Sequence, residues 1–538
     1  MAAVTAPDRR LRPAENRDTG AAREFDLPIP ERLARYPFWL LGGAVVLVVM
    51  AISAVLRTRY LHGQFWMDEG LSVGISTHAL FDIPHVLRHD GSPPLYYMLL
   101  HCWMSLFGSS EASTHALSVV FSLLCVPVGA WLAFSLFGRW AGLIALILFA
   151  LNPFLTVYSE ETRMYSLMAL LGLLATAGFI HGFIYRRRRF LILFAVSQTL
   201  MLYTHAWGIF FGVGAAIAFV LVWRAGDERR ALLIDGLLSF GAAAVLFLPW
   251  LPTLLYQAAH TGSPWDKAPN FGAPVQISRN LMGGDRATVA LFLAGAIGIA
   301  GLLRSSRWRT RESLVIWTLI LLPAGTLGFG WIVSHFSPAW AYRYFAPVIG
   351  SMLLVATAGM ARARGVGLLA LLLVIVFWAN PGEFTPHNKS DMRQVAAEMA
   401  PKLHRGDLVI LGQPEQVPLA WYYLPAGLRF ANTSGTVSDP QSMNWVDALH
   451  RLQDANPNTT LNRLIATLKP NQQVLFVRPL TEGAQNWQAP WTVLVRRRSA
   501  QWGALLASNP SLKPVAWAPH KYRGSCCVAD SALLYRKL

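Results

Sequence analysis

An acidic pair, Asp68 and Glu69, is the first feature of the sequence with the means to do chemistry. It closely follows the first apolar run, residues 38–56, which is long enough to cross the roughly 30 Å hydrocarbon core of a bilayer. The pair therefore emerges at the membrane surface in a chain with only 14% charged residues. Taken alone, it fits either a site for a substrate that arrives through the lipid or a solvated loop.

More unusual polar residues stand between the later apolar runs. They are His89, Tyr97, Glu161, Arg163, Tyr165, His205 and Arg343. The two arginines suit a phosphate, because a guanidinium group offers paired donors to its oxygens. A carboxylate such as Asp68 can take the proton of an attacking hydroxyl, and a phosphate leaves as a stable anion without an acid. This set of residue types favours group transfer from a lipid phosphate.

The segment before Arg163 also has a structural interpretation. Ser159 is placed to cap the next helix, with Glu160 and Glu161 favoured in its first turn by the helix dipole. Arg163 would lie in that same turn, where a cation is unfavourable. We therefore expect Arg163 to contact an anion, either the lipid phosphate or a carboxylate in an ion pair.

Composition predicts a polytopic membrane protein with a soluble portion. The 538 residues are 54% hydrophobic with a mean hydropathy of +0.39, and soluble proteins carry nearer 25% charged residues. The net charge of +17 comes from basic loops between apolar runs, the positive-inside pattern, and indicates no nucleic-acid partner. Residues 1–36 are polar and Arg-rich, which predicts a disordered cytoplasmic tail.

The apolar runs and their basic loops predict about eleven transmembrane helices within a domain spanning residues 37–380. The run 93–107 is short, starts with two prolines and carries His101, so an interfacial or re-entrant helix suits it better than a crossing. With the N-terminus in the cytoplasm, the polar segments named above and residues 381–538 lie outside.

Residues 381–538 have the length and pattern of a small periplasmic α/β domain, for which we expect an accessory role. Within it the pattern predicts a helix over 391–404 and strands over 407–412, 474–479, 491–497 and 532–537.

Short motifs from the first outer loop to Tyr344 match a known family. They are Trp66–Glu69, Pro93–Tyr97, Ser109–Glu111, Phe137–Arg139, Asn152–Phe154, Tyr158–Leu167, Tyr203–His205 and Arg343–Tyr344. In these motifs the chain resembles the GT-C superfamily of polyprenyl-phosphate-sugar glycosyltransferases, and most of all the bacterial relatives of protein O-mannosyltransferases and the lipid A aminoarabinose transferase. The resemblance implies an α-helical GT-C membrane fold, Asp68 as base or metal contact with Glu69 beside it, and Arg163 and Arg343 as contacts of the lipid phosphate.

Two motifs depart from the family pattern. Ser92 stands where many relatives have His or, in the aminoarabinose branch, Lys, and Glu160–Arg163 replaces the usual Gln-Glu-Ala-Arg. Aminoarabinose is therefore disfavoured as the sugar.

The sequence thus predicts an inverting glycosyltransferase of the bacterial inner membrane with a periplasmic active site. It would move a mannose-like hexose or an arabinose-like pentose from a polyprenyl phosphate to a lipid, glycan or protein acceptor. The sequence leaves open whether a divalent metal ion binds at Asp68. The main alternative is a transporter or lipid flippase, which internal repeats and ionisable residues in mid-span would favour, but the sequence shows neither. A catalytically silent membrane scaffold is a second alternative, favoured by Ser92.

Overall fold

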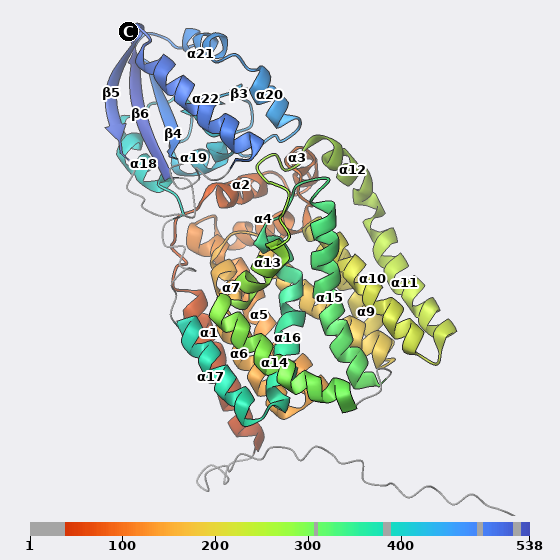
Figure 1. Cartoon of the computed structure of the whole chain (residues 1–538). Coiled ribbons are helices and arrows are strands. Elements are labelled where there is room, and N and C mark those ends of the chain that lie inside the picture. Colours follow the sequence, from red (N-terminus) through yellow and green to blue (C-terminus); the bar gives the residue numbers. More distant parts are fainter. Residues whose placement is uncertain (1–37, 306–309, 380–388, 481–487, 520–528) are drawn as a thin grey trace, which may run out of the picture. The chain divides into compact units, whose positions relative to one another are not determined.

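The described residues from Phe38 to Ala379 form helices, and those from Lys389 onward combine helices with a sheet (Figure 1). A computed structural model describes residues 38–305, 310–379, 389–480, 488–519 and 529–538. The expected tail, 1–36, and the expected domain boundary at 381 lie outside these residues. From Leu47 onward the chain forms one unit.

The helical part consists of consecutive helices joined by short connections. They are α1 (Phe38–Arg57), α2 (Met67–Ser76), α3 (Ile83–Asp90), α4 (Leu95–Phe107), α5 (Glu111–Phe137), α6 (Arg139–Leu151), α7 (Pro153–Val157), η1 (Tyr158–Glu160), α8 (Tyr165–Phe179), η2 (Ile180–Ile184), α9 (Arg189–Thr204), α10 (Gly208–Ala225), α11 (Arg229–Phe247), η3 (Leu248–Trp250), α12 (Leu251–His260), α13 (Ala273–Met282), α14 (Asp285–Ser305), α15 (Arg311–Val333), η4 (Tyr342–Val348), α16 (Ile349–Arg362) and α17 (Gly365–Ala379).

The predicted polytopic membrane fold is confirmed. Within the described residues, six helices are long and apolar enough to cross a membrane, or up to eight if each of two bent pairs is one span. Four shorter apolar helices accompany them, among them Leu95–Phe107. The count of about eleven crossings, and the prediction that Leu95–Phe107 does not cross, remain predictions.

A buried arginine stabilises the break between α6 and α7. Pro153 begins α7 and has no N–H, so the Phe149 carbonyl loses its helical partner. Arg57, which is fully buried, donates from Nη2 to the Phe149 oxygen (2.8 Å) and from Nη1 to the Ala150 oxygen (2.6 Å). Its Nε donates to Ser122 Oγ at 2.8 Å. These bonds satisfy the carbonyls at the break, just ahead of the polar segment 158–163.

The C-terminal part is built around a six-stranded mixed sheet in the order β3-β2-β1-β4-β6-β5. Its strands are β1 (Leu408–Leu411), β2 (Arg429–Asn432), β3 (Gly435–Val437), β4 (Gln473–Leu480), β5 (Leu512–Ala518) and β6 (Ala529–Lys537). The helices are α18 (Met392–Met399), η5 (Ala400–Lys402), η6 (Pro414–Gln416), α19 (Val417–Tyr423), α20 (Ala448–Asp454), α21 (Pro457–Ala466) and α22 (Pro490–Ala507). β1 pairs in parallel with β2 and β4, and the remaining pairs are antiparallel.

Helices cover both faces of this sheet, so its central strands are apolar on both sides. In β1, Leu408 and Ile410 pack with residues of α21 and α22, whereas Val409 and Leu411 pack with α18 and α19. The hydrophobic cluster that Val409 and Leu411 form with α18 and α19 also contains Phe65 and Val73, and Val73 belongs to α2. The C-terminal sheet and α2 therefore share one hydrophobic core.

The expected helix at 391–404 and the strands at 407–412, 474–479 and 532–537 correspond to α18 with η5 and to β1, β4 and β6. The expected strand at 491–497 is wrong, because this segment is the start of α22. Within seven residues the segment holds Trp491, Thr492, Val493 and Val495, aromatic and β-branched residues that are typical of strands. Over the full helix the buried residues are Trp491, Val495, Ser499, Trp502 and Leu506, which recur every three to four positions.

Candidate functional site

Helix α2 carries Asp68 and Glu69 in its first turn, where the helix dipole favours carboxylates. One side of α2 carries two glycines, which have no side chains, and the C-terminal part packs closely against this side. A Cβ added at Gly70 would lie 2.7 Å from Leu419 Cα, and one at Gly74 would lie 2.1 Å from the Gln441 carbonyl oxygen. The two glycines, four residues apart, therefore let α2 approach the C-terminal backbone and fix the helix that bears the acidic pair.

Glu69 lies at the centre of a buried hydrogen-bond network. Its Oε1 accepts from His115 Nε2 (2.7 Å), from the Thr162 amide (2.8 Å) and from Lys389 Nζ (3.1 Å). Its Oε2 accepts from Lys389 Nζ (3.0 Å) and from the Trp66 amide (3.2 Å). Both oxygens are therefore occupied, and the network joins four separate stretches of the chain.

The charges of this network keep Glu69 ionised although it has no exposed surface. Burial opposes ionisation, but Lys389, His115 and the Thr162 amide outweigh it and lower the pKa of Glu69 to about 2. Lys389 also donates to the Glu160 carbonyl at 2.8 Å. The network thus ties the start of the C-terminal part to α2 and to the segment before α8.

Asp68, by contrast, is partly exposed and faces two arginines. Its Oδ2 lies 3.7 Å from Arg343 Nη2 and 4.0 Å from Arg163 Nη2, and its side chain is 24% exposed. Both distances exceed those of a hydrogen bond, so the two guanidinium groups attract the carboxylate without being engaged by it. The arrangement leaves Asp68 open to solvent and to a ligand.

Other side chains hold the two guanidinium groups in place. Arg163 Nη1 donates to Ser72 Oγ (3.1 Å) and to the Asp68 carbonyl (3.3 Å). Among the described residues its buried Nε has no hydrogen-bond partner. Arg343 Nε donates to Tyr165 Oη (3.0 Å). Each arginine therefore keeps donors for an additional anion.

Aromatic rings surround Arg343. Its guanidinium carbon lies 5.5 Å from the ring centroids of Trp66 and Tyr344 and 6.0 Å from that of Tyr165, within cation–π range. His205 stands next to this cage, 5.0 Å from the Tyr344 ring. Burial, reinforced by the charges of Arg163 and Arg343, lowers the pKa of His205 to about 3, so its imidazole is neutral.

Two further carboxyl groups near the cluster are buried. Burial raises the pKa of Glu161 to about 7, with contributions from the charges of Glu69 and Asp68. Burial likewise raises the pKa of Asp90 to about 6, although Ser92 and Arg163 favour its ionised form. Near neutral pH, Glu161 is therefore about half protonated, so it opposes an anionic ligand less than an ordinary carboxylate would.

The structure gathers most of the residues expected at the site. Asp68, Arg163, Arg343, Tyr165 and His205 form one cluster through the contacts given above. Glu69, next to Asp68, is fully buried, and its charge acts on Glu161. Tyr97 is buried in α4, and its hydroxyl and Arg163 influence each other electrostatically. His89 is the exception, since it lines a separate cavity against the C-terminal part.

The expected cap at Ser159 is wrong. Ser159 belongs to η1 and donates to the Thr156 carbonyl, while α8 begins only at Tyr165. Arg163 therefore precedes the helix and does not lie in its first turn. Between the break after α6 and the start of α8, the chain forms α7, η1 and a short irregular segment. The expectation that Arg163 faces an anion holds through Asp68, its ion-pair partner.

Sequence reasoning missed Ser72, His115 and Lys389. A signal existed for His115, because an ionisable residue inside an apolar run is expected to face the protein interior. Lys389 had no such signal, since it stands alone in a polar stretch more than 300 residues from its partner. Only folding reveals that contact.

The site does not suit a metal ion. Within the described residues no three His, Cys, Asp or Glu side chains form a group able to hold one. The carboxylate suggested as a ligand, Asp68, already faces two guanidinium groups, which repel a cation.

No family model and no curated protein matches the sequence. Solved structures do match. ArnT from Cupriavidus metallidurans in the apo state superposes with a TM-score of 0.59 at 16% identity, covering 93% of this chain and 98% of that chain. The chain has the GT-C fold. The α-helical GT-C membrane fold that the motifs implied is thereby confirmed.

Two further GT-C structures agree with this assignment. ArnT from the same organism bound to undecaprenyl phosphate gives a TM-score of 0.58 at 13% identity, with coverage of 93% and 98%. The apo oligosaccharyltransferase of Archaeoglobus fulgidus gives 0.53 at 12% identity, covering 91% of this chain and 74% of that one. At these identities the likeness establishes the GT-C fold itself.

Proposed function

We propose that the protein is a glycosyltransferase that moves a sugar from a polyprenyl phosphate to an acceptor outside the membrane. The observation that carries this proposal is the pair of arginines, Arg163 and Arg343, that flank the open carboxylate of Asp68. Within a GT-C fold this pair is suited to a lipid phosphate, and one solved structure of that fold, ArnT, binds undecaprenyl phosphate. The sugar would be a mannose-like hexose or an arabinose-like pentose.

In the proposed reaction the acceptor hydroxyl attacks the anomeric carbon of the sugar from the side opposite the phosphate. The new C–O bond forms as the bond to the phosphate oxygen breaks, and the electron pair leaves with the phosphate. Asp68 takes the hydroxyl proton, while Arg163 and Arg343 stabilise the charge that develops on the leaving phosphate. One displacement inverts the anomeric configuration, and no acid is required.

Glu69 has a different role in this proposal. Both of its oxygens are engaged and it has no exposed surface, so it positions α2 and does not exchange protons. Tyr165 and Trp66 hold Arg343, and Ser72 holds Arg163. In this proposal the neutral imidazole of His205, the hydroxyl of Tyr97 and the carboxyl group of Glu161 contact the donor.

The proposal includes an arrangement in the membrane. The N-terminus lies in the cytoplasm of a bacterial cell, residues 37–380 cross the inner membrane, and the active site and residues 381–538 lie on the periplasmic side. The positive-inside distribution of basic loops supports this orientation.

The test is the stabilisation of the purified protein by undecaprenyl phosphate, measured as a shift in melting temperature. A phosphate contact at Arg163 predicts a smaller shift in Arg163→Lys, which keeps the charge but loses the paired donors, and the smallest shift in Arg163→Ala. Arg224→Ala, at an exposed position near the end of α10, is the matched control and should keep the full shift.

An ion pair with Asp68 that is merely structural predicts another outcome. Arg163→Ala would then melt at a lower temperature without lipid, yet undecaprenyl phosphate would stabilise it as much as the unchanged protein. That result would reject the phosphate contact.

A further inference from the structure

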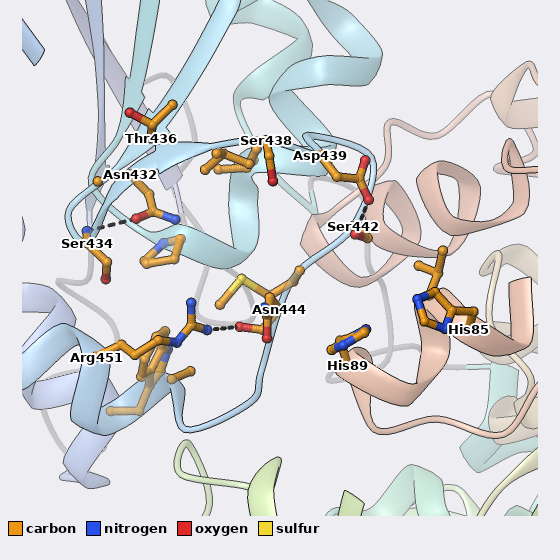
Figure 2. Close-up of a pocket in the computed structure, with 18 residues that line it drawn as sticks. His85, His89, Asn432, Ser434, Thr436, Ser438, Asp439, Ser442, Asn444 and Arg451 are labelled. Carbon is orange, nitrogen blue, oxygen red and sulfur yellow. Dashed lines mark hydrogen bonds between the residues drawn. The ribbon is translucent and has the colours of Figure 1, made fainter. Parts of the chain in front are cut away.

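A polar cavity of about 370 Å³ lies between α3 and the edge of the C-terminal sheet (Figure 2). Small-molecule sites usually have volumes of roughly 300–1,000 Å³, so this one is large enough for part of a ligand. His85 and His89 line it from α3, and Asn432, Ser434, Ser438 and Asn444 line it from the C-terminal part. The cavity is separate from the arginine cluster, and none of Asp68, Arg163 and Arg343 lines it.

The charged residues of this cavity are already paired. Asp439 accepts from Ser442 and lies 3.3 Å from His78, and Arg451 donates to the carbonyls of Val446 and Asn444. The other polar groups on its wall are hydroxyls, amides and imidazoles, which between them both donate and accept hydrogen bonds. Such a wall suits an uncharged ligand rich in hydroxyl groups better than it suits an anion.

The cavity adjoins the arginine cluster along α3. His89 lines the cavity, while the next residue, Asp90, is buried and interacts electrostatically with Arg163 and Asp68. Helix α3 therefore lines the cavity with His89 and, at the next residue, carries a buried carboxyl group within electrostatic range of the proposed base.

The wall of the cavity that contains Pro414 and Trp491 is also connected to the neighbourhood of Asp68. Pro414 and Trp491 line the cavity, and Glu415, next to Pro414, accepts from Trp491 Nε1 at 3.0 Å. Burial raises the pKa of Glu415, and the charge of Asp68 adds to this effect. Gln413 contacts Met67, the residue before Asp68. On this wall the chain therefore runs from the cavity at Pro414 to a contact with the residue before Asp68.

We propose that this cavity binds the acceptor, and that the acceptor is an uncharged carbohydrate chain whose reacting hydroxyl extends to Asp68. The proposal rests on the proposed glycosyl transfer and adds the class of acceptor and the place where it binds. It also gives the C-terminal part a definite role, because fifteen of the eighteen residues that line the cavity belong to it.

The experiment is calorimetric titration of the full-length protein in nanodiscs with a small panel of probes. The panel holds uncharged linear trisaccharides of mannose, arabinose and glucose, trigalacturonic acid as an anionic sugar, and a Ser/Gly hexapeptide. At least one uncharged trisaccharide should bind. Ser438→Trp, which fills the cavity, should weaken this binding at least about tenfold, as expected when one or two hydrogen bonds are lost.

Ser508→Trp is the matched control, because Ser508 is exposed at the end of α22 and does not line the cavity. It should bind the trisaccharide unchanged. His89→Ala tests the opposite wall with a smaller change and should also weaken binding. Melting temperatures without ligand show whether each variant is folded, and affinities are compared only between folded proteins.

Several outcomes would overturn the proposal. They are equal trisaccharide affinity in folded wall variants and the unchanged protein, a preference for trigalacturonic acid or the peptide, and no binding by any uncharged trisaccharide. The stabilisation by undecaprenyl phosphate is measured on the same samples. If it is absent from the unchanged protein, the proposed function fails; if it is present while the sugars fail, only the acceptor site is wrong.

Discussion

Replacing Glu69 by Gln should destabilise the protein by about 3–5 kcal/mol, whereas the matched change Asp68→Asn should leave it folded and remove activity. The pKa of Glu69 falls from its ordinary 4.5 to about 2 on folding, and this difference is equivalent to roughly 3 kcal/mol. Since the folded pKa is the lower one, this stabilisation is present above about pH 4.5 and is lost as the pH falls towards 2.

The environment of Glu69 leads to a similar magnitude by another route. Its removal leaves Lys389, whose side chain is 6% exposed, and buried His115 without an anionic partner. Breaking a buried ion pair by removing one member costs about 3–5 kcal/mol, because the remaining charge stays buried and unpaired. Asp68 is 24% exposed and sits at looser distances, so Asp68→Asn should change stability by about 1 kcal/mol or less.

The assay combines denaturant unfolding near pH 7 and near pH 4 with a transfer assay. Glu69→Gln should have a lower free energy of unfolding than the unchanged protein at pH 7. This difference between the two proteins should be smaller at pH 4. Asp68→Asn should unfold normally, keep its stabilisation by undecaprenyl phosphate, and turn over about 10²-fold more slowly, the usual effect of removing a general base. A stable but inactive Glu69→Gln beside an active Asp68→Asn would refute the reasoning and exchange the two roles.

Three further predictions follow from the geometry. Glu161→Gln should be more stable than the unchanged protein above pH 7, by about 3 kcal/mol. Burial raises the pKa of this carboxyl from 4.5 to about 7, so the unchanged protein loses stability as the pH rises through that range. Equal melting temperatures of the variant and the unchanged protein across pH 5–8 would contradict this. Gly74→Ala should lower the melting temperature and make the C-terminal part more sensitive to protease, because its Cβ would meet a backbone oxygen at 2.1 Å, whereas Gly241→Ala in α11, with nothing within 4 Å, should be neutral or slightly stabilising. In a background without native cysteines, a cysteine at Ser508 should react with an impermeant thiol reagent from the periplasm and one at Asp227 should not; labelling of the first only after lysis would mean that the number of crossings is even.

The helical fold and most of the candidate site could be predicted from the sequence because both depend on local pattern. Apolar runs of sufficient length predict spans wherever they stand, and basic loops orient them. The short motifs around Asp68, Arg163 and Arg343 predicted a shared site because each lies at the end of a span. The strand expected at 491–497 failed for a local reason, since seven residues do not distinguish alternation from helical periodicity when the buried face continues beyond them.

The sequence by itself determined that Asp68 and Glu69 emerge together from a membrane-spanning chain, with arginines in the later loops. Only the tertiary structure separated their roles, because neighbours in the first turn of a helix point in different directions. Glu69 points to Lys389 and His115, partners from distant segments, and Asp68 points to Arg163 and Arg343 at a solvent-accessible edge. Burial and pairing are properties of the assembled core, and they left one of two adjacent carboxylates buried with both oxygens paired and the other partly exposed between two arginines.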